Sequence, residues 1–258
     1  MQVVILCGGM GTRLREETEF KPKPMVQIGD RPILWHIMRH YSTHNFNKFI
    51  LCTGYRGDMI KNYFLSYRQN TGDLEIDLAT GKQTLLGAPE GKLDWRVRIQ
   101  DTGVETLTGA RIKAALKYIE EDCFLATYGD GVANVDIGKL VKHHNDSGKL
   151  ATVTAVRPSS RFGELALEGN MVRSFNEKPQ IGEGWINGGF LVIDKKAFEH
   201  VRDTDNIALE SGVLEALAEQ GELSVYRHEG FWQCMDTYRE QCLLEDMWKA
   251  KNAPWKTW

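Results

Sequence analysis

The residue types best suited to chemistry begin with a glycine-rich run at positions 6–14, which reads LCGGMGTRL. Glycines let a backbone approach a phosphate with several N–H groups pointing inward, and Arg13 adds a forked donor. The run lacks the Gly-Lys-Ser/Thr ending of a P-loop, and it has Leu14 where the dinucleotide fingerprint needs a third glycine. It therefore predicts a loop for a polyanion, while a P-loop ATPase or an NAD enzyme is disfavoured. A simple chain reversal is the alternative interpretation.

A lysine follows shortly after this loop, in the run KPKPM at positions 21–25. The flanking prolines exclude a regular helix and hold Lys23 in a stiff, extended segment. Arg13 and Lys23 together are suited to neutralising a leaving pyrophosphate. A solvated pair of lysines is the alternative.

Two aspartates close apolar runs in distant parts of the chain. Asp130 ends the run FLATYGD between two glycines, and Asp236 ends FWQCMD just before an expected helix. An acid at the carboxyl end of a buried strand faces the ligand crevice of an α/β sheet. The two carboxylates could hold one Mg²⁺ through one oxygen each, leaving its other positions to phosphate and water. Taken singly, each also fits a turn or a helix cap.

The elements that must position these groups alternate along the chain. Strand-like runs at 2–7, 48–53, 122–127 and 150–156 are separated by helical spacing at 31–45 and 136–147. This order predicts an α/β fold with a central, mostly parallel mixed sheet flanked by helices. We expect one domain, 1–258, with an excursion at 68–100 and an elaborated half at 162–258. That half contains expected strands at 163–168, 171–177, 185–193 and 222–228, and expected helices at 209–220 and 237–249.

Composition narrows the function classes. A net charge of -3 lacks the basic excess that nucleic-acid binding requires. The five cysteines lie scattered, without the close pairs of a zinc site or disulfide framework, as expected for reduced cytosolic thiols. The first apolar run is too short for a signal peptide or membrane span, so we expect a cytoplasmic chain that starts at Met1 and has no membrane partner.

Taken together and in order, the motifs resemble those of the sugar-1-phosphate nucleotidylyltransferases. The resemblance covers essentially the whole chain, and its combined specificity is high although each motif is moderate. It implies a Rossmann-like nucleotidyltransferase fold. The motifs that carry it are LxGGxGTRL, KPKPM, PILWHIM, LTGAR, YGDG, EKP, INGG, GFWQ, WxxMDT and the closing APWKTW.

The resemblance also implies roles for the matching positions. Catalysis would use Arg13, Lys23, Asp130 and Asp236, and the two aspartates would hold the metal. Sugar-phosphate contacts would come from Tyr128, Glu177, Lys178, Asn187 and Gly188. Nucleotide contacts would come from Leu6, Gly8, Gly9, Met10, Gly11, Thr12, Arg13, Lys23, Thr108, Arg111 and Asp130. The family segment reads Thr-Gly-Gly-Arg, and Ala110 replaces its second glycine. Alanine would cost about 1 kcal/mol there if the backbone needs a positive φ.

The resemblance is strongest to members that transfer a cytidylyl group from CTP to glucose 1-phosphate with Mg²⁺. It implies the products CDP-glucose and pyrophosphate, supply of a surface polysaccharide such as the O-antigen of lipopolysaccharide, and a homo-oligomer such as a hexamer. Residue spacing leaves the base open, so a uridylyl- or thymidylyltransferase is the first alternative. A non-catalytic sugar-nucleotide sensor is the second, although a sensor needs neither a metal nor leaving-group charge.

Overall fold

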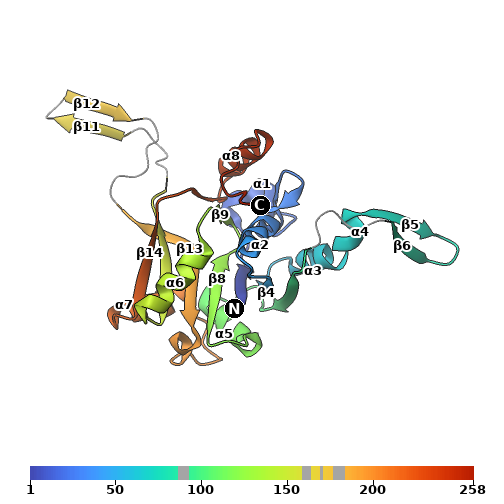
Figure 1. Cartoon of the computed structure of the whole chain (residues 1–258), viewed down its shortest axis with the longest axis horizontal. Helices are drawn as coiled ribbons and strands as arrows, with labels where there is room; N and C mark the ends of the chain where they lie inside the picture. Colours follow the sequence, from blue (N-terminus) through green and yellow to red (C-terminus); the bar gives the residue numbers. More distant parts are fainter. Residues whose placement is uncertain (87–92, 159–163, 169–170, 177–183) are drawn as a thin grey trace.

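The computed structural model describes residues 1–86, 93–158, 164–168, 171–176 and 184–258, and it shows a central sheet covered by helices (Figure 1). The sheet has seven strands in the order β14-β10-β13-β8-β1-β4-β7. Its strands are β1 (Val3–Cys7), β4 (Lys48–Thr53), β7 (Arg96–Asp101), β8 (Cys123–Tyr128), β10 (Ala151–Val156), β13 (Ile186–Asp194) and β14 (Leu223–His228).

The direction of the strands makes this sheet mixed but mostly parallel. The β8, β1, β4 and β7 strands run parallel, as do β10 and β14, whereas β13 is antiparallel to both β8 and β10. The buried centre is apolar, as the run Val3–Cys7 illustrates, and this is the pattern of strands covered on both faces. The predicted α/β class and the mostly parallel sheet are confirmed.

Helices cover the two faces of the sheet and form two hydrophobic clusters. The first contains Ile37 of α2, Leu140 of α6 and Leu244 of α8, and the second contains Ile112 of α5 and Leu217 of α7. No helix in the described part of the chain is long and apolar enough to cross a membrane. The helices are α1 (Arg15–Thr18), α2 (Ile33–Thr43), α3 (Gly57–Leu65), α4 (Tyr67–Thr71), α5 (Thr108–Ala115), α6 (Ile137–Ser147), α7 (Glu215–Glu219) and α8 (Tyr238–Lys249).

Two hairpins project from this body (Figure 1). One pairs β5 (Asp73–Asp77) with β6 (Lys82–Leu86), and the other pairs β11 (Glu164–Glu168) with β12 (Met171–Asn176). The expected excursion at 68–100 is therefore too long, because its last part, β7, is the edge strand of the central sheet. We call the β5–β6 hairpin with α4 the arm.

Candidate active site

The glycine-rich loop begins where β1 ends, at the carboxyl edge of the parallel strands. Gly11 has a φ of 63°, a left-handed conformation that favours glycine. The hydroxyl of Thr18 donates to the carbonyls of Gly11 at 2.9 Å and Leu14 at 2.7 Å, which fixes the far end of the loop. The local sequence thus produces a tight loop at the edge where an open α/β sheet binds its ligands.

A cavity of about 550 Å³ opens beside this loop. It is lined by most of the residues to which the family resemblance assigned nucleotide contacts. Those lining residues are Leu6, Gly8, Gly9, Met10, Gly11, Thr12, Lys23, Thr108, Arg111 and Asp130, joined by Tyr128. The side chain of Arg13 lies outside the described atoms.

The two aspartates meet because the short strands next to them pair. The β9 strand (Gly131–Ala133) follows Asp130 directly, and β15 (Trp232–Cys234) ends shortly before Asp236. These strands are antiparallel, and the Met235 N–H donates to the Asp130 carbonyl at 2.8 Å. Sequence spacing alone could not foresee this pairing, which brings two acids from distant parts of the chain to one place.

Lys23 lies between the two carboxylates. Its ammonium group is 2.8 Å from Asp130 Oδ2 and also binds Asp236 Oδ1. Burial lowers the pKa of Lys23, but the two carboxylates outweigh burial and raise the pKa overall, so the side chain is charged at neutral pH. In this arrangement one cation is shared by two acidic groups, and Lys23 is 7% exposed.

The acidic pair has the chemistry of a site for a hard divalent cation. One oxygen from each aspartate already converges on a single positive charge, and carboxylate oxygens are the ligands that Mg²⁺ prefers. Within the described ranges, no group of three or more His, Cys, Asp or Glu could hold a metal. Two protein ligands suit a Mg²⁺ that keeps its other positions for water and substrate phosphates.

Arg111 faces the underside of the glycine loop. Its guanidinium donates to the Thr53, Gly8 and Val104 carbonyls at 3.0, 3.2 and 3.1 Å, and to the Thr102 hydroxyl at 2.5 Å. These four bonds use both terminal nitrogens, so the guanidinium ties three loops together at one corner of the cavity. Its neighbour Ala110 lies in the first turn of α5 and is not among the residues with positive φ, so the expected strain is absent.

The residues expected near the hexose phosphate are only partly described. Asn187 Nδ2 lies 3.5 Å from the Tyr128 hydroxyl, and the Gly188 carbonyl accepts from Trp232 Nε1 at 2.7 Å. The other two, Glu177 and Lys178, lie outside the described residues. The structure thus brings Tyr128 and Asn187 together, and Tyr128 lines the same cavity as Asp130.

Sequence reasoning missed two acidic residues of the cavity wall, which are Glu105 and the hydrogen-bonded Glu210. The Glu210 carboxylate accepts from the Tyr128 hydroxyl through Oε1 and from the Thr108 hydroxyl at 2.9 Å through Oε2. Glu210 begins a π-helical turn, Glu210–Leu214. Such turns carry one extra residue and frequently occur at functional sites, but nothing in the apolar spacing of 209–220 distinguishes one from an ordinary helix.

This sheet carries a glycine loop at its carboxyl edge and two aspartates that share a lysine, which is the architecture of an α/β nucleotidyltransferase. The family described as Nucleotidyl transferase matches residues 2–246. The glucose-1-phosphate cytidylyltransferase of Salmonella typhi is 46% identical over 259 residues, covering 100% of both chains. The probable glucose-1-phosphate cytidylyltransferase of Bacillus subtilis is 45% identical over 258 residues, again covering 100% of both.

Solved structures agree on the fold. HddC from Yersinia pseudotuberculosis superposes with a TM-score of 0.71 at 24% identity, covering 96% of this chain and 99% of HddC. The chain belongs to the nucleotidyl transferase family and, within it, to the glucose-1-phosphate cytidylyltransferases.

Proposed function

We propose that this chain transfers the cytidylyl group of CTP to α-D-glucose 1-phosphate, with Mg²⁺, to give CDP-glucose and pyrophosphate. The observation that carries the proposal is the pair Asp130 and Asp236, which converges on the Lys23 ammonium group. Lys23 and Asp130 line the same cavity as the glycine loop. Two cytidylyltransferase relatives identical at 45% and 46% of positions supply the choice of base and sugar.

In this mechanism a phosphate oxygen of glucose 1-phosphate attacks the α-phosphorus of CTP in line with departing pyrophosphate. Both reactants are anions, so the protein's task is to position them and to offset their repulsion. The loop from Gly8 to Thr12 binds the triphosphate through its N–H groups, Arg13 and Lys23 add positive charge, and Lys178 holds the sugar phosphate. No protein nucleophile is required.

Asp130 and Asp236 are the residues that would hold Mg²⁺, one oxygen each. Bound there, the ion would supply charge neutralisation at the phosphate oxygens. Because the Lys23 ammonium group shares these two carboxylates, we propose that Lys23 turns towards the triphosphate when the substrates are bound.

The reaction is tested by incubating the purified protein with glucose 1-phosphate, Mg²⁺ and each nucleoside triphosphate in turn. We expect pyrophosphate release and a nucleoside diphosphate glucose with CTP well above the other nucleotides. Turnover with UTP or dTTP in place of CTP would select the first alternative, and silence with every nucleotide would select the sugar-nucleotide sensor.

A substitution tests the role of the acidic pair in catalysis. Asp236→Asn should lower kcat about 100-fold or more, the range for loss of a central electrostatic group. Asp246→Asn, an exposed position on the adjacent helix α8, is the matched control and should leave kcat unchanged. Near-normal turnover of the Asp236 variant would remove that aspartate from the mechanism.

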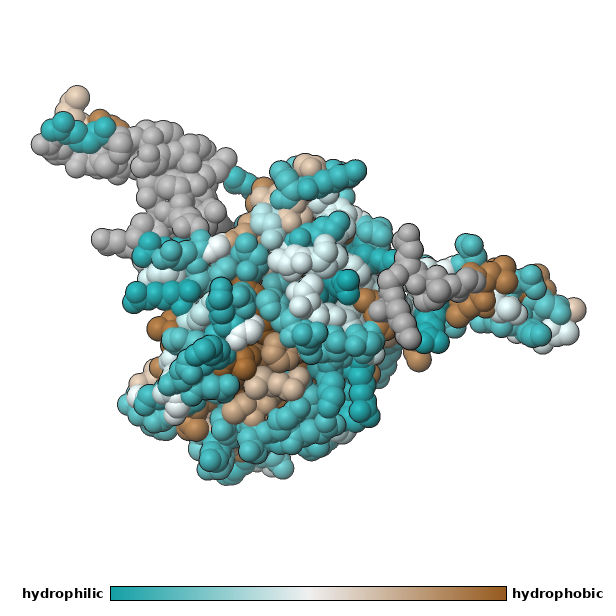
Figure 2. Space-filling model, in the orientation of Figure 1, coloured by the Kyte–Doolittle hydropathy of each residue, from teal (hydrophilic) through white to brown (hydrophobic). Residues whose placement is uncertain are grey.

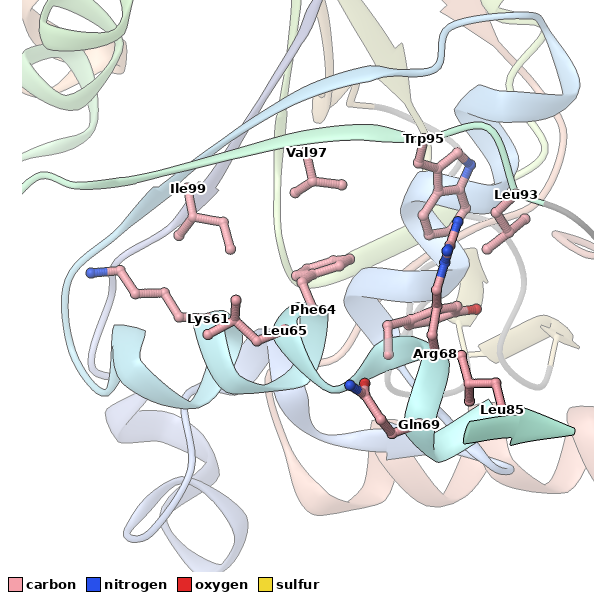
Figure 3. Close-up of a pocket in the computed structure, with 11 residues that line it drawn as sticks. Lys61, Phe64, Leu65, Arg68, Gln69, Leu85, Leu93, Trp95, Val97 and Ile99 are labelled. Carbon is pink, nitrogen blue, oxygen red and sulfur yellow. The ribbon is translucent and has the colours of Figure 1, made fainter. Parts of the chain in front are cut away.

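We also propose that the chain works as a homo-oligomer in which the arm contacts a second copy. A cavity of about 690 Å³ lies beneath the arm, between α3, α4 and the edge strand β7 (Figure 3). Its lining includes Phe64, Leu65, Leu85, Trp95, Val97 and Ile99. Across the hairpin, Leu74 pairs with Leu85, and Ile76 lies two residues further on the same face. This apolar stripe continues into the cavity.

The same proposal includes the cellular compartment of the enzyme, its domain organisation and the use of its product. Five free cysteines suit a reducing compartment, so we place the protein in the cytoplasm. We regard 1–258 as one nucleotidyltransferase domain whose second half contributes the sugar and metal contacts. Its product would supply a surface polysaccharide such as the O-antigen of lipopolysaccharide.

A further inference from the structure

Glu210 forms part of the wall of the cavity that the glycine loop also lines. It is exposed to that cavity, and no cation within the described ranges forms an ion pair with it. A carboxylate beside a site for polyanions repels their phosphates. A favourable role for it is therefore a contact with a neutral part of the substrates. Its position therefore calls for a chemical explanation.

The hydrogen atoms around Glu210 can be assigned. Thr108 Oγ1 accepts from the Leu209 N–H at 2.7 Å, so its own proton is free to donate to Glu210 Oε2. Burial, followed by the Glu210 carboxylate, raises the pKa of Tyr128 well above its usual range, so this phenol keeps its proton and donates it to Oε1. Both hydroxyl protons thus point at Glu210.

The oxygens on this part of the cavity wall can therefore offer a ligand only lone pairs. An ionised carboxylate only accepts hydrogen bonds, and each hydroxyl whose proton is already donated can offer a ligand only its oxygen. The Glu210, Tyr128 and Thr108 oxygens therefore form an acceptor-only surface. A ligand group that donates hydrogen bonds fits it, and a carbonyl oxygen does not.

The surface is held rigidly by the segment before the π-helical turn. Asn206 accepts from the Leu107 N–H at 2.8 Å and donates to the Glu105 carbonyl at 3.1 Å, and the Ala110 N–H donates to the Ile207 carbonyl at 3.0 Å. A side chain on Gly109 would lie 3.0 Å from the Ala208 backbone, so glycine permits this close approach. A preorganised wall of this kind can discriminate between ligands because it cannot rearrange cheaply.

We propose that Glu210, with Tyr128 and Thr108, selects the nucleotide base by accepting a hydrogen bond from the exocyclic amine of cytosine. Uracil and thymine present a carbonyl oxygen at that position, which would face the carboxylate with acceptor against acceptor. Glu210 lines the same cavity as the glycine loop, as a group reading the base of the loop-bound nucleotide must. This inference rests on the proposed function.

The test compares nucleotides in wild-type enzyme and in Glu210→Gln, which keeps the size of the side chain but adds a donor. We expect the ratio of kcat/KM for CTP to that for UTP to fall at least about tenfold, mainly through KM for CTP. KM for glucose 1-phosphate should stay unchanged. Glu219→Gln, an exposed carboxylate at the end of α7, is the matched control and should keep the wild-type ratio.

Other outcomes would overturn the inference. An unchanged CTP to UTP ratio would do so, as would a rise in KM for glucose 1-phosphate alone, which would assign Glu210 to the hexose. If the variant lost its affinity for CTP but not for 2′-deoxy-CTP, Glu210 would instead bind the ribose. Glu210→Asp, which keeps the charge, should retain more of the preference than Glu210→Gln.

Equilibrium binding separates this inference from the proposed function. Calorimetric titration of CTP and UTP into each variant measures base selection without turnover. If wild-type protein binds CTP over UTP through Glu210 but forms no CDP-glucose, the proposed reaction fails while the base-selecting role stands. Equal binding of both nucleotides by wild type would sink the base-selecting role even if the enzyme turns over.

Discussion

Among single residues, Arg111 shows how a buried charge can stabilise the conformation of a loop. A buried guanidinium is costly unless its donors are paired, and this one is paired with three carbonyls and a hydroxyl. A Cβ on Gly8 would lie 2.0 Å from Arg111 Nη1, so the glycine leaves the space that the guanidinium fills. The Arg111 guanidinium therefore requires glycine at position 8, and the loop conformation depends on both residues.

Arg111→Lys should therefore destabilise the fold as well as the site. One ammonium group cannot span partners on three loops, so we expect a loss of about 3 kcal/mol in the free energy of unfolding. CTP binding should weaken about tenfold because the Gly8 carbonyl is released. Urea unfolding and calorimetric titration measure these effects, and Arg202→Lys, on the exposed surface, serves as control. Lost CTP binding at unchanged stability would instead make Arg111 a direct nucleotide ligand.

Such residues show how much of the site could be predicted from the sequence. The glycine loop and the aspartates are visible because their residue types are unusual at strand ends, and Lys23 is visible because prolines flank it. Arg111 lines the cavity in which the nucleotide is expected, but the bond from its guanidinium to the Gly8 carbonyl could not be predicted. Spacing fixes a helix face and not the loop that packs beneath it. Glu210 went unnoticed because its partners, Thr108 and Tyr128, come from other parts of the chain.

At the scale of elements, buried strands were easier to predict than edge elements. The runs of β1, β4 and β8 are mainly apolar, and β10 alternates apolar residues with threonine. The β7 strand instead alternates arginine with Val97 and Ile99, which resembles the short alternating stretches of an excursion. The α5 helix was missed because Leu107 precedes it and gives no side-chain cap. Tertiary packing determines these elements more than their local sequence does.

The α2 helix contains two histidines that the fold keeps neutral. His36 Nε2 donates to the Ile28 carbonyl at 2.9 Å and His40 Nε2 to the Val135 carbonyl at 2.8 Å. The opposite nitrogen of His36 is 3.4 Å from the Trp255 indole N–H, so a second proton would face a donor. Burial lowers the pKa of both histidines to about 4.

These lowered pKa values predict an acid-sensitive fold. The unfolded chain takes up protons near the ordinary histidine value of 6.5, whereas the folded chain resists them until about 4. Stability is therefore complete above 6.5 and falls as the pH drops to about 4, by up to about 3 kcal/mol for each histidine. Urea unfolding at a series of pH values measures this slope. His36→Gln with His40→Gln should flatten it, and His200→Gln, an exposed position, should not.

At the scale of the whole molecule, the arm is the feature that a single copy does not explain. A two-stranded hairpin is at best marginally stable alone, yet β5 and β6 extend away from the body (Figure 1). Figure 2 shows hydrophobic residues along the arm, and Ile76 and Leu85 of the apolar stripe are 48% and 39% exposed. A second copy covering this stripe would remove apolar surface from water and stabilise the hairpin.

Sedimentation of the purified chain tests this contact. We expect a particle several times the 29.3 kDa of one chain, and Ile76→Glu should shift it to smaller species because a charge cannot be buried unpaired in an apolar contact. Leu243→Glu, at a comparably exposed leucine on α8, is the matched control and should leave the assembly intact. A wild-type chain that sediments as a monomer at micromolar concentration would show that the arm needs no second copy. If Ile76→Glu also lowers kcat while its monomers stay folded, the contact contributes to the active site as well as to assembly.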